Sequence, residues 1–325
     1  DDVTAGDGAD LVYGGEGNDQ ISGGDDNDTI YAGVGDDTVY GGDGNDIIMG
    51  SAGDDIIVGG NDDDVAVFAG NQSNYTFASS PDGLTINVTD TANNYSDTVS
   101  GVETLRFDDG DIYVSQDANG LVLTGTTSGD TITVVGTVPV TLKGDDGNDT
   151  ISGGEGDDTI SGDAGNDIIE GGAGNDIIMG GDGSNLAVFA GNQSNYTFAS
   201  SPDGLTITVT DIVNDYVDTV TGIETLRFDN GDIYVSQDAN GLVLMGGAGD
   251  DTITVVGPVP VKLIGDDGND TIYSSSDADI VSGDDGDDTI YSGSGADIVS
   301  GDDGDDTIYS GSGADIVSGD DGDDT

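Results

Sequence analysis

The chain has 325 residues, of which 67 are acidic, 4 are basic and 58 are glycine, and it contains no histidine, cysteine or tryptophan. The net charge of −63 excludes nucleic acids and anionic membrane surfaces as partners, because binding them requires basic groups that neutralise phosphates. The missing residue types exclude catalysis by Ser-His-Asp or Cys-His arrangements, a disulfide framework and the usual zinc sites.

A nonapeptide repeat dominates the start of the chain. Seven copies follow one another from residue 5 to residue 67, among them GGEGNDQIS at 14–22 and GGDGNDIIM at 41–49. Further copies fill 144–188 and 265–318, and isolated copies stand at 125–133 and 246–254. Position six is aspartate in 19 of these 20 copies, and position eight is valine or isoleucine in 18 of them. Such regularity predicts a repeat architecture with one structural unit per copy.

Each nonapeptide predicts a turn followed by a short strand. The first six positions are rich in aspartate and in glycine, which permits positive φ and close backbone approach. The last three positions form the strand, with position eight pointing inward and its neighbours outward. Two nonapeptides make one coil, so stacked coils form two thin parallel sheets that face each other. The third block shows this doubled period directly, because GDDGDDTIYSGSGADIVS occupies both 283–300 and 301–318.

Two longer segments interrupt the repeats. Residues 67–123 recur at 188–244, and VFAGNQSNYTFASSPDGLTI is identical in both copies. Their polar and apolar alternation, their aromatic side chains and their Asp-Gly turns predict small modules of β-strands. We therefore expect an all-β chain with almost no helix. Its five parts are a repeat block at 1–67, a module at 68–124, a repeat block at 125–188, a second copy of the module at 189–245 and a repeat block at 246–325.

The acidic side chains of the repeats predict a bound cation. One coil buries only two aliphatic side chains, which is too little to offset the conformational entropy of ordering its backbone. Carboxylates stacked one strand spacing apart also repel each other. A hard divalent cation relieves this repulsion and links successive coils. Ligands that are all carboxylate or carbonyl oxygen, in an irregular cage, favour Ca²⁺ over Mg²⁺.

The repeat resembles the GGxGxDxUx motif of the repeats-in-toxin (RTX) calcium-binding proteins, where U is a large aliphatic residue. GGEGNDQIS at 14–22 and GGAGNDIIM at 171–179 match it closely. The resemblance implies a right-handed parallel β-roll with multiple Ca²⁺ ions between successive turns, held by position-six carboxylates and turn carbonyls. It also implies type I secretion and folding in extracellular calcium.

The same resemblance implies the calcium ligands, residue by residue. Asp130 and Asp251 are not included among these ligands, because the nine residues that follow each of these two repeats lack the acidic residues of a turn. Asn185 offers only a neutral oxygen, and Asp277 replaces a turn glycine beside its site. The implied ligands are the position-six aspartates Asp10, Asp19, Asp28, Asp37, Asp46, Asp55, Asp64, Asp149, Asp158, Asp167, Asp176, Asp270, Asp279, Asp288, Asp297, Asp306, Asp315 and Asp324.

Outward-facing residues give two further predictions. Tyrosines at 273, 291 and 309 recur at every second repeat and should stack as a ladder on one sheet face, or form a flat surface for self-association. Arg106 follows Glu103 by three residues, and Arg227 follows Glu224 likewise. We expect a structural ion pair between the two residues in each module.

These features favour a structural or adhesive extracellular protein. Calcium would convert a secretable coil into a rigid rod that serves as a surface layer, a fibril or an adhesin stalk, with self-association into fibrils or layers. The alternative is the secretion-aiding region of an RTX enzyme or toxin whose catalytic domain lies outside this chain. The chain starts and stops within a repeat, so we expect it to be part of a longer protein.

Other functions are disfavoured. The repeat accounts for the carboxylates and no tryptophan is present, so we expect no enzyme within these residues. Ice binding requires regular ranks of threonine and asparagine, whereas Thr127 is the only threonine at position three. No apolar run approaches the ~20 residues of a membrane span, so we expect an extracellular or cell-surface protein without membrane insertion.

Overall fold

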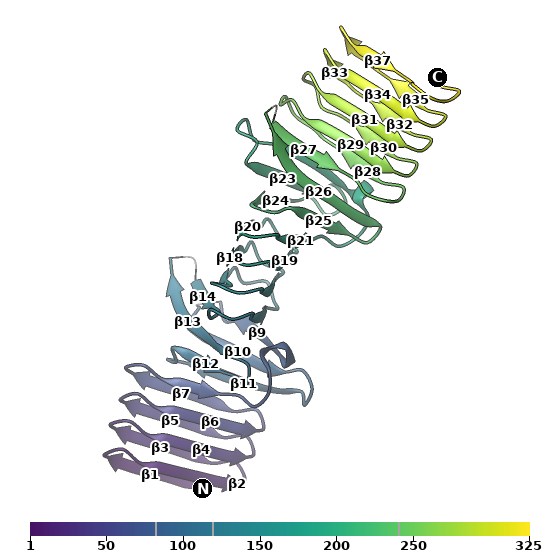
Figure 1. Ribbon diagram of the computed structural model, residues 1–325. Coiled ribbons are helices and arrows are strands. Elements are labelled where there is room, and N and C mark those ends of the chain that lie inside the picture. The colour runs from purple at the N-terminus through teal and green to yellow at the C-terminus, as the bar shows by residue number, and fades with distance from the viewer. Residues whose placement is uncertain (82, 119, 240) are drawn as a thin grey trace. The chain divides into compact units, whose positions relative to one another are not determined.

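The computed structural model describes residues 1–81, 83–118, 120–239 and 241–325 (Figure 1). Almost all regular structure among them is β-strand, and the exceptions are the short 3₁₀ turns η1 (Gln72–Asn74) and η2 (Gln193–Asn195). The prediction of an all-β fold with almost no helix is confirmed for these residues. No helix in the described ranges is long and apolar enough to span a membrane. The chain divides into two compact units, 1–167 and 168–325.

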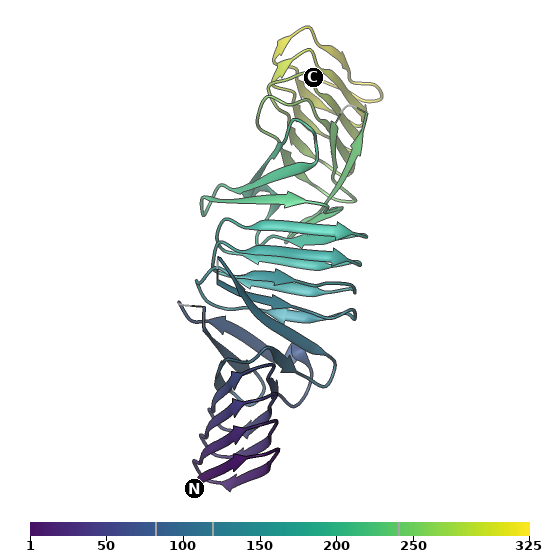
Figure 2. The same cartoon turned by 90° about the vertical axis from the view of Figure 1, so that its left-hand side faces the viewer.

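The first unit begins with a parallel β-roll, as predicted. Each coil gives one strand to each of two parallel sheets, and every strand pairs with the strand two repeats further on, as Ile30 does with Ile48. Figure 2 shows these coils as successive rungs at the N-terminal end of the unit. One sheet contains β1 (Asp2–Asp7), β3 (Gln20–Asp25), β5 (Thr38–Asp43) and β7 (Ile56–Asn61), and the other contains β2 (Leu11–Glu16), β4 (Thr29–Val34), β6 (Ile47–Ala52) and β8 (Val65–Val67).

Most strands of this roll are longer than the sequence predicted. Strand β4 covers positions seven to nine of one repeat and positions one to three of the next. Residues at these last positions also stand in register with the next coil, as Gly33 does with Ser51. Here the predicted six-residue turn is wrong, because only positions four to six turn the chain. Glycines at positions two and four allow this path, since Gly33 and Gly35 both have positive φ.

Position eight forms the core, as predicted. Ile21 and Ile57 in one sheet, and Ile30 and Ile48 in the other, are 0% exposed. Their strands place them one above another in successive coils, so each sheet contributes one column of aliphatic side chains. The core therefore consists of two facing columns, each one side chain deep. So thin a core stabilises the roll only in part, and the remaining stability has to come from contacts at its edges.

The first module continues both sheets of the roll. Strand β11 (Tyr95–Ser100) pairs in parallel with β7, and β12 (Thr104–Arg106) pairs in parallel with β8. Antiparallel strands then extend the first sheet through β10 (Thr85–Asp90) and β9 (Tyr75–Ser79), and the second through β13 (Asp111–Asp117) and β14 (Gly120–Thr124). Roll geometry resumes in β15 (Thr131–Thr133), β16 (Thr141–Lys143), β17 (Thr150–Gly154) and β18 (Thr159–Ala164).

The second unit repeats this plan. Strand β24 (Tyr216–Thr221) pairs in parallel with β20 (Ile177–Asp182), and β25 (Thr225–Phe228) with β21 (Leu186–Val188), so the second module also continues a roll. The strands before and within this module are β19 (Ile168–Gly172), β20 (Ile177–Asp182), β21 (Leu186–Val188), β22 (Tyr196–Ser200), β23 (Thr206–Asp211), β24 (Tyr216–Thr221), β25 (Thr225–Phe228), β26 (Gly231–Asp238) and β27 (Gly241–Met245). The following roll contains β28 (Thr252–Thr254), β29 (Lys262–Asp267), β30 (Thr271–Tyr273), β31 (Ile280–Asp285), β32 (Thr289–Tyr291), β33 (Ser294–Gly295), β34 (Ile298–Asp303), β35 (Thr307–Tyr309), β36 (Ser312–Gly313) and β37 (Ile316–Ser318).

Aromatic residues pack in two different ways. Within the first module, Phe68, Tyr75 and Phe107 form a buried cluster with ring centroids 5.0–5.7 Å apart. On the outer face of the last roll, the rings of Tyr273, Tyr291 and Tyr309 stack with centroids 4.6 Å apart. The predicted tyrosine ladder is therefore confirmed. The division of the chain into five parts stays a prediction, because strand pairing runs on from roll to module.

Candidate metal centre

The position-six aspartates lie at the two edges of the roll, immediately before each strand. Most of them are almost completely buried, and Asp46, for example, is 0% exposed. Among the 18 predicted ligands, Asp10 and Asp315 are half-buried and Asp324 is exposed. These three belong to the first and last coils of the chain. A carboxylate is costly to bury without a compensating partner, so the contacts of the buried ones are informative.

Each of these carboxylates connects its coil to the preceding one. The Asp19 backbone N–H donates to Asp37 Oδ1 at 2.8 Å, and the Asp28 N–H donates to Asp46 Oδ1 at 2.8 Å. The contact recurs in successive coils along both edges, as between Asp37 and Asp55. The backbone thus stacks the carboxylates into two columns, one on each edge, with no basic side chain beside them in the described contacts.

The second carboxylate oxygen has no such contact. In many of these aspartates, Oδ2 is buried and accepts no hydrogen bond within the described residues. A buried polar atom without a partner costs about 1–3 kcal/mol, and more when it carries charge. The aspartates that share this arrangement are Asp19, Asp28, Asp37, Asp46, Asp55, Asp64, Asp149, Asp270, Asp288, Asp297 and Asp306.

Position-one glycines make room for this oxygen. A Cβ at Gly41 would overlap with Asp46 Oδ2 of the same repeat, and one at Gly23 would overlap with Asp28 Oδ2. The glycine at position one is therefore required by close approach and not by a special φ angle. Backbone carbonyls of the next coil lie nearby, since a Cβ at Gly23 would also meet the Gly41 oxygen and one at Gly41 the Gly59 oxygen. Carboxylate and carbonyl oxygens are thus gathered between successive turns.

Burial dominates the electrostatics of these columns. It raises the pKa of Asp64, Asp149 and Asp270 to about 7, and that of Asp55 and Asp288 to about 6. Neighbouring carboxylates raise these pKa values further, and the backbone hydrogen bond to Oδ1 partly opposes the increase. Keeping these five carboxylates ionised in the folded chain therefore opposes folding unless a cation joins them.

The oxygen donors present here suit calcium. Within the described ranges, no group of three or more acidic side chains converges on one point. An ion between two turns would therefore take carbonyl oxygens in addition to one or two carboxylates. Ca²⁺ accepts six to eight oxygen ligands in flexible geometry, whereas Mg²⁺ demands a near-ideal octahedron. The buried Oδ2 atoms and the gathered carbonyls fit Ca²⁺.

Some position-six residues find partners within the protein instead. Asp130 Oδ1 accepts the side-chain amide N–H of Gln72 at 2.7 Å, and its Oδ2 accepts the Thr126 N–H. Gln72 Oε1 in turn accepts the Thr131 N–H at 2.8 Å. In the roll, the backbone of the preceding coil supplies the N–H and the carbonyl for these two contacts. Here the side-chain amide of Gln72 supplies both. The same contacts join Gln193 to Asp251 and Thr252 in the second unit.

Two other predicted exceptions have clear geometry. Asp279 Oδ2 accepts hydrogen bonds from Ser274 Oγ at 2.8 Å and from the Ser275 N–H at 3.0 Å. To bind a cation, this carboxylate would have to give up part of these hydrogen bonds. Asn185 is buried and its side-chain amide donates to the Gly222 carbonyl. Its nitrogen therefore points toward oxygen atoms that a carboxylate would repel.

Four acidic residues of the modules occupy the places of position-six aspartates, which the sequence prediction missed. Asp97 Oδ1 accepts the Asp55 N–H at 2.9 Å, and Glu103 Oε2 accepts the Asp64 N–H at 2.8 Å. The second unit repeats both contacts with Asp218 and Glu224. One signal was present, because Asp-Thr-Val at 97–99 is identical to positions six to eight at 37–39.

The expected ion pair between Arg106 and Glu103 is wrong. Arg106 Nε donates to Asp111 Oδ1 at 3.0 Å, because the two residues face each other in the antiparallel pair of β12 and β13. The Glu103 carboxylate is directed instead to the roll edge. In the second unit, Arg227 likewise pairs with Asp232 and not with Glu224.

Comparisons with known proteins identify the repeat. The family model of the RTX calcium-binding nonapeptide repeat (4 copies) matches residues 4–39, 31–66, 141–169, 153–187, 243–254, 264–299 and 291–325, more than half of the chain. A solved structure of the extracellular lipase LipA from Serratia marcescens is 21% identical, with a TM-score of 0.24. The alignment covers 67% of this chain and only 38% of the lipase, and so weak a likeness carries no argument. No curated protein matches the chain.

Proposed function

Because the chain belongs to the family of proteins with RTX calcium-binding nonapeptide repeats, we propose that calcium converts it from an unfolded chain into stiff structural rolls outside the cell. The repeats bind several calcium ions. We assign the ions to the two edges of each roll, between successive turns. Their ligands there are position-six carboxylates and turn carbonyls.

One observation carries this assignment. Within the described residues, the buried Oδ2 atoms of Asp37, Asp46 and the other aspartates grouped with them above accept no hydrogen bond, and burial raises the pKa of most of these carboxylates. A divalent cation supplies the missing partner and removes the repulsion between stacked carboxylates in one step. Without it, a core of two thin aliphatic columns has to hold these charges in place.

The proposed role is mechanical. Proteins of this family are typically secreted by the type I route, and folding that waits for extracellular calcium would keep the chain unfolded during export. The identical tandem copies at 283–300 and 301–318 and the recurrence of 67–123 at 188–244 support a long array. We infer a surface layer, fibril or adhesin stalk, with lateral self-association through the remaining negative surface and further calcium.

Calcium titration of the metal-free chain tests the proposal. Far-UV circular dichroism and light-scattering size should report cooperative compaction into β structure, with a midpoint of about 0.1–1 mM, the range of extracellular calcium modules. Mg²⁺ at the same concentration is the control and should not replace Ca²⁺. A chain that is already folded without calcium, or that folds equally well in Mg²⁺, contradicts the proposal.

The size measurement also separates two roles. Particles that lengthen with protein concentration in calcium support a layer or fibril. A monomer at every concentration favours a stalk, or the secretion-aiding region of a larger enzyme or toxin. Sequencing the flanking gene distinguishes these last two, because a continuing array supports the stalk and a catalytic motif supports the enzyme.

A further inference from the structure

We propose that each module carries its own calcium site, in which Asp97 and Asp218 extend the ligand column of the roll beyond the nonapeptides. These two residues lie outside every segment that matches the repeat motif. The inference rests on the proposed calcium binding by position-six carboxylates. It adds one ion at the junction between each module and the roll before it.

The first argument is that the roll's edge contacts continue into the module unchanged. The Asp55 N–H donates to Asp97 Oδ1 at 2.9 Å, as the Asp37 N–H donates to Asp55 Oδ1 at 2.8 Å. The preceding turn position continues as well, because Asp54 Oδ1 accepts the Ser96 N–H at 2.8 Å. Asp97 is thus the next carboxylate of the column, although it lies 42 residues along the chain from Asp55.

The second argument is an unsatisfied oxygen on the roll side of the junction. Asp55 is 1% exposed, and its Oδ2 accepts no hydrogen bond within the described residues. That oxygen lies against Gly50 at position one of the same repeat. Asp97 is 8% exposed, so two nearly buried carboxylates follow each other in one column, and within the described residues both accept hydrogen bonds from backbone N–H groups and not from basic side chains. A cation is the partner that satisfies both.

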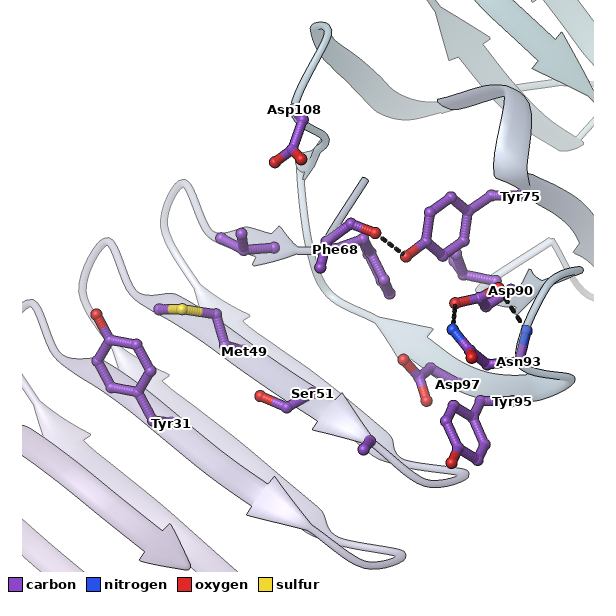
Figure 3. Close-up of a pocket in the computed structure, with 14 residues that line it drawn as sticks. Tyr31, Met49, Ser51, Phe68, Tyr75, Asp90, Asn93, Tyr95, Asp97 and Asp108 are labelled. Atoms are coloured by element: carbon purple, nitrogen blue, oxygen red, sulfur yellow. Dashed lines mark hydrogen bonds between the residues drawn. The ribbon is translucent and has the colours of Figure 1, made fainter. Parts of the chain in front are cut away.

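The third argument is space. A cavity of about 660 Å³ opens at the junction, and its lining includes Ser51 and Ala52 at the end of β6 and Asp97 of β11. Figure 3 shows the Asp97 and Ser51 side chains among those that line this cavity, with Tyr95 next to Asp97. Asp90 lies nearby, but its carboxylate is occupied by the N–H groups of its own turn. The cavity leaves room for water molecules that complete the coordination of Ca²⁺.

The second unit reproduces the arrangement independently. The Asp176 N–H donates to Asp218 Oδ1 at 2.8 Å, and the lining of a cavity of about 280 Å³ includes Asp218, Gly172 and Ala173. The neighbouring hairpin differs between the modules, with Thr91 and Ala92 replaced by Ile212 and Val213. The acidic contact is thus present in both modules although the turn beside it has different side chains.

The other edge of each junction lacks such a site. Between Asp97 and Glu103 the chain has five residues, whereas successive position-six residues in the roll are separated by eight. The longer glutamate side chain spans this shortened turn and reaches the Asp64 N–H. Because this connection is three residues shorter, it offers fewer carbonyl oxygens to complete the coordination of a calcium ion. We therefore assign one additional ion per module and not two.

Native mass spectrometry of the full chain in saturating calcium tests the assignment. Asp97→Asn keeps the acceptor for the Asp55 N–H but removes a charge and a ligand, so the variant should hold one ion fewer than the unmodified chain. The Asp97→Asn and Asp218→Asn double variant should hold two fewer. Asp97→Ala, which removes both oxygens, covers the case in which the asparagine oxygen still binds the ion. Circular dichroism in calcium checks that each variant is folded.

Two control variants separate a failure of the module site from a failure of the proposed calcium binding by the rolls. Asp130→Asn changes an equally buried aspartate whose oxygens are already bonded within the protein, and it should leave the ion count unchanged. Asp37→Asn changes a roll ligand and should lower the count. If Asp37→Asn loses ions while folded Asp97→Ala loses none, the module site is wrong and the proposed function stands. If Asp37→Asn also loses none, the proposed function itself fails.

Discussion

Acidification should stabilise the fold when calcium is absent. Burial is the largest cause that raises the pKa of Asp64, Asp149 and Asp270, and it brings each to about 7. In the unfolded chain an aspartate titrates near pH ~4. Each of these carboxylates therefore binds more protons in the folded state, so folding becomes more favourable as the pH falls. The destabilisation is complete above pH ~7, and it disappears below the unfolded pKa of ~4.

The structure sets the size of this effect. Each pH unit between the unfolded and the folded pKa is worth about 1.4 kcal/mol, so one such aspartate opposes folding by about 4 kcal/mol at pH ~8 and by roughly 1.5 at pH ~5. Acidification from pH ~8 to pH ~5 thus raises the free energy of unfolding by roughly 2–3 kcal/mol for each such carboxylate. Neighbouring carboxylates share part of this gain because they repel each other. Even one contribution is large beside the stability of about 5–15 kcal/mol that is typical of domains.

Urea unfolding in a calcium chelator, followed by circular dichroism, measures the effect between pH ~8 and pH ~5. We expect the β signal to appear or its midpoint to rise on acidification. Salt is the matched control, because it screens exposed charges but does not restore the hydration of buried ones. If salt alone reproduces the gain, general repulsion explains it. If metal-free stability is unchanged or falls toward pH ~5, the carboxylates are not buried as described.

Three substitutions and one control variant test separate parts of the structure. Gly41→Ala should prevent calcium-dependent folding of the first roll, because its Cβ would overlap with the column carboxylate, whereas Gly8→Ala, which meets no atom but has to adopt a φ of +102°, should cost about 1–3 kcal/mol in thermal or urea unfolding. Gln72→Ala should destabilise the calcium-bound chain by about 2 kcal/mol without changing its ion count, since Asp130 loses a buried donor; a lost ion would contradict this. Tyr291→Ala should cost less than about 1 kcal/mol in urea unfolding, because its stacked ring is at the surface; a larger loss would show that the ladder is essential.

The regular parts of the molecule could be predicted because a strict period makes neighbours in sequence into neighbours in space. Position eight of every coil faces inward, so Ile30 and Ile48 were recognisable as core from spacing alone. The same period placed the position-six carboxylates in columns. Strand length was misjudged, because positions one to three join the ladders only through backbone pairing with the next coil, which residue preferences do not reveal.

The junctions could not be predicted, because their contacts follow no fixed spacing. Asp97 takes its place 42 residues after Asp55, and Gln72 contacts Asp130 across 58 residues. Arg106 selects Asp111 because an antiparallel register places them opposite each other, although Glu103 is nearer in sequence. Such contacts depend on how the module folds back onto the roll.

The sequence by itself determined the repeat, the parallel β-roll, the aliphatic core and the need for an oxygen-binding cation, because each follows from residue type at a constant interval. Only the tertiary structure decided which carboxylates lack a partner and which are satisfied by the protein. That distinction depends on single hydrogen bonds, such as the one from Gln72 to Asp130. A period cannot contain this information, since identical aspartates in identical repeats meet different neighbours where a roll and a module join.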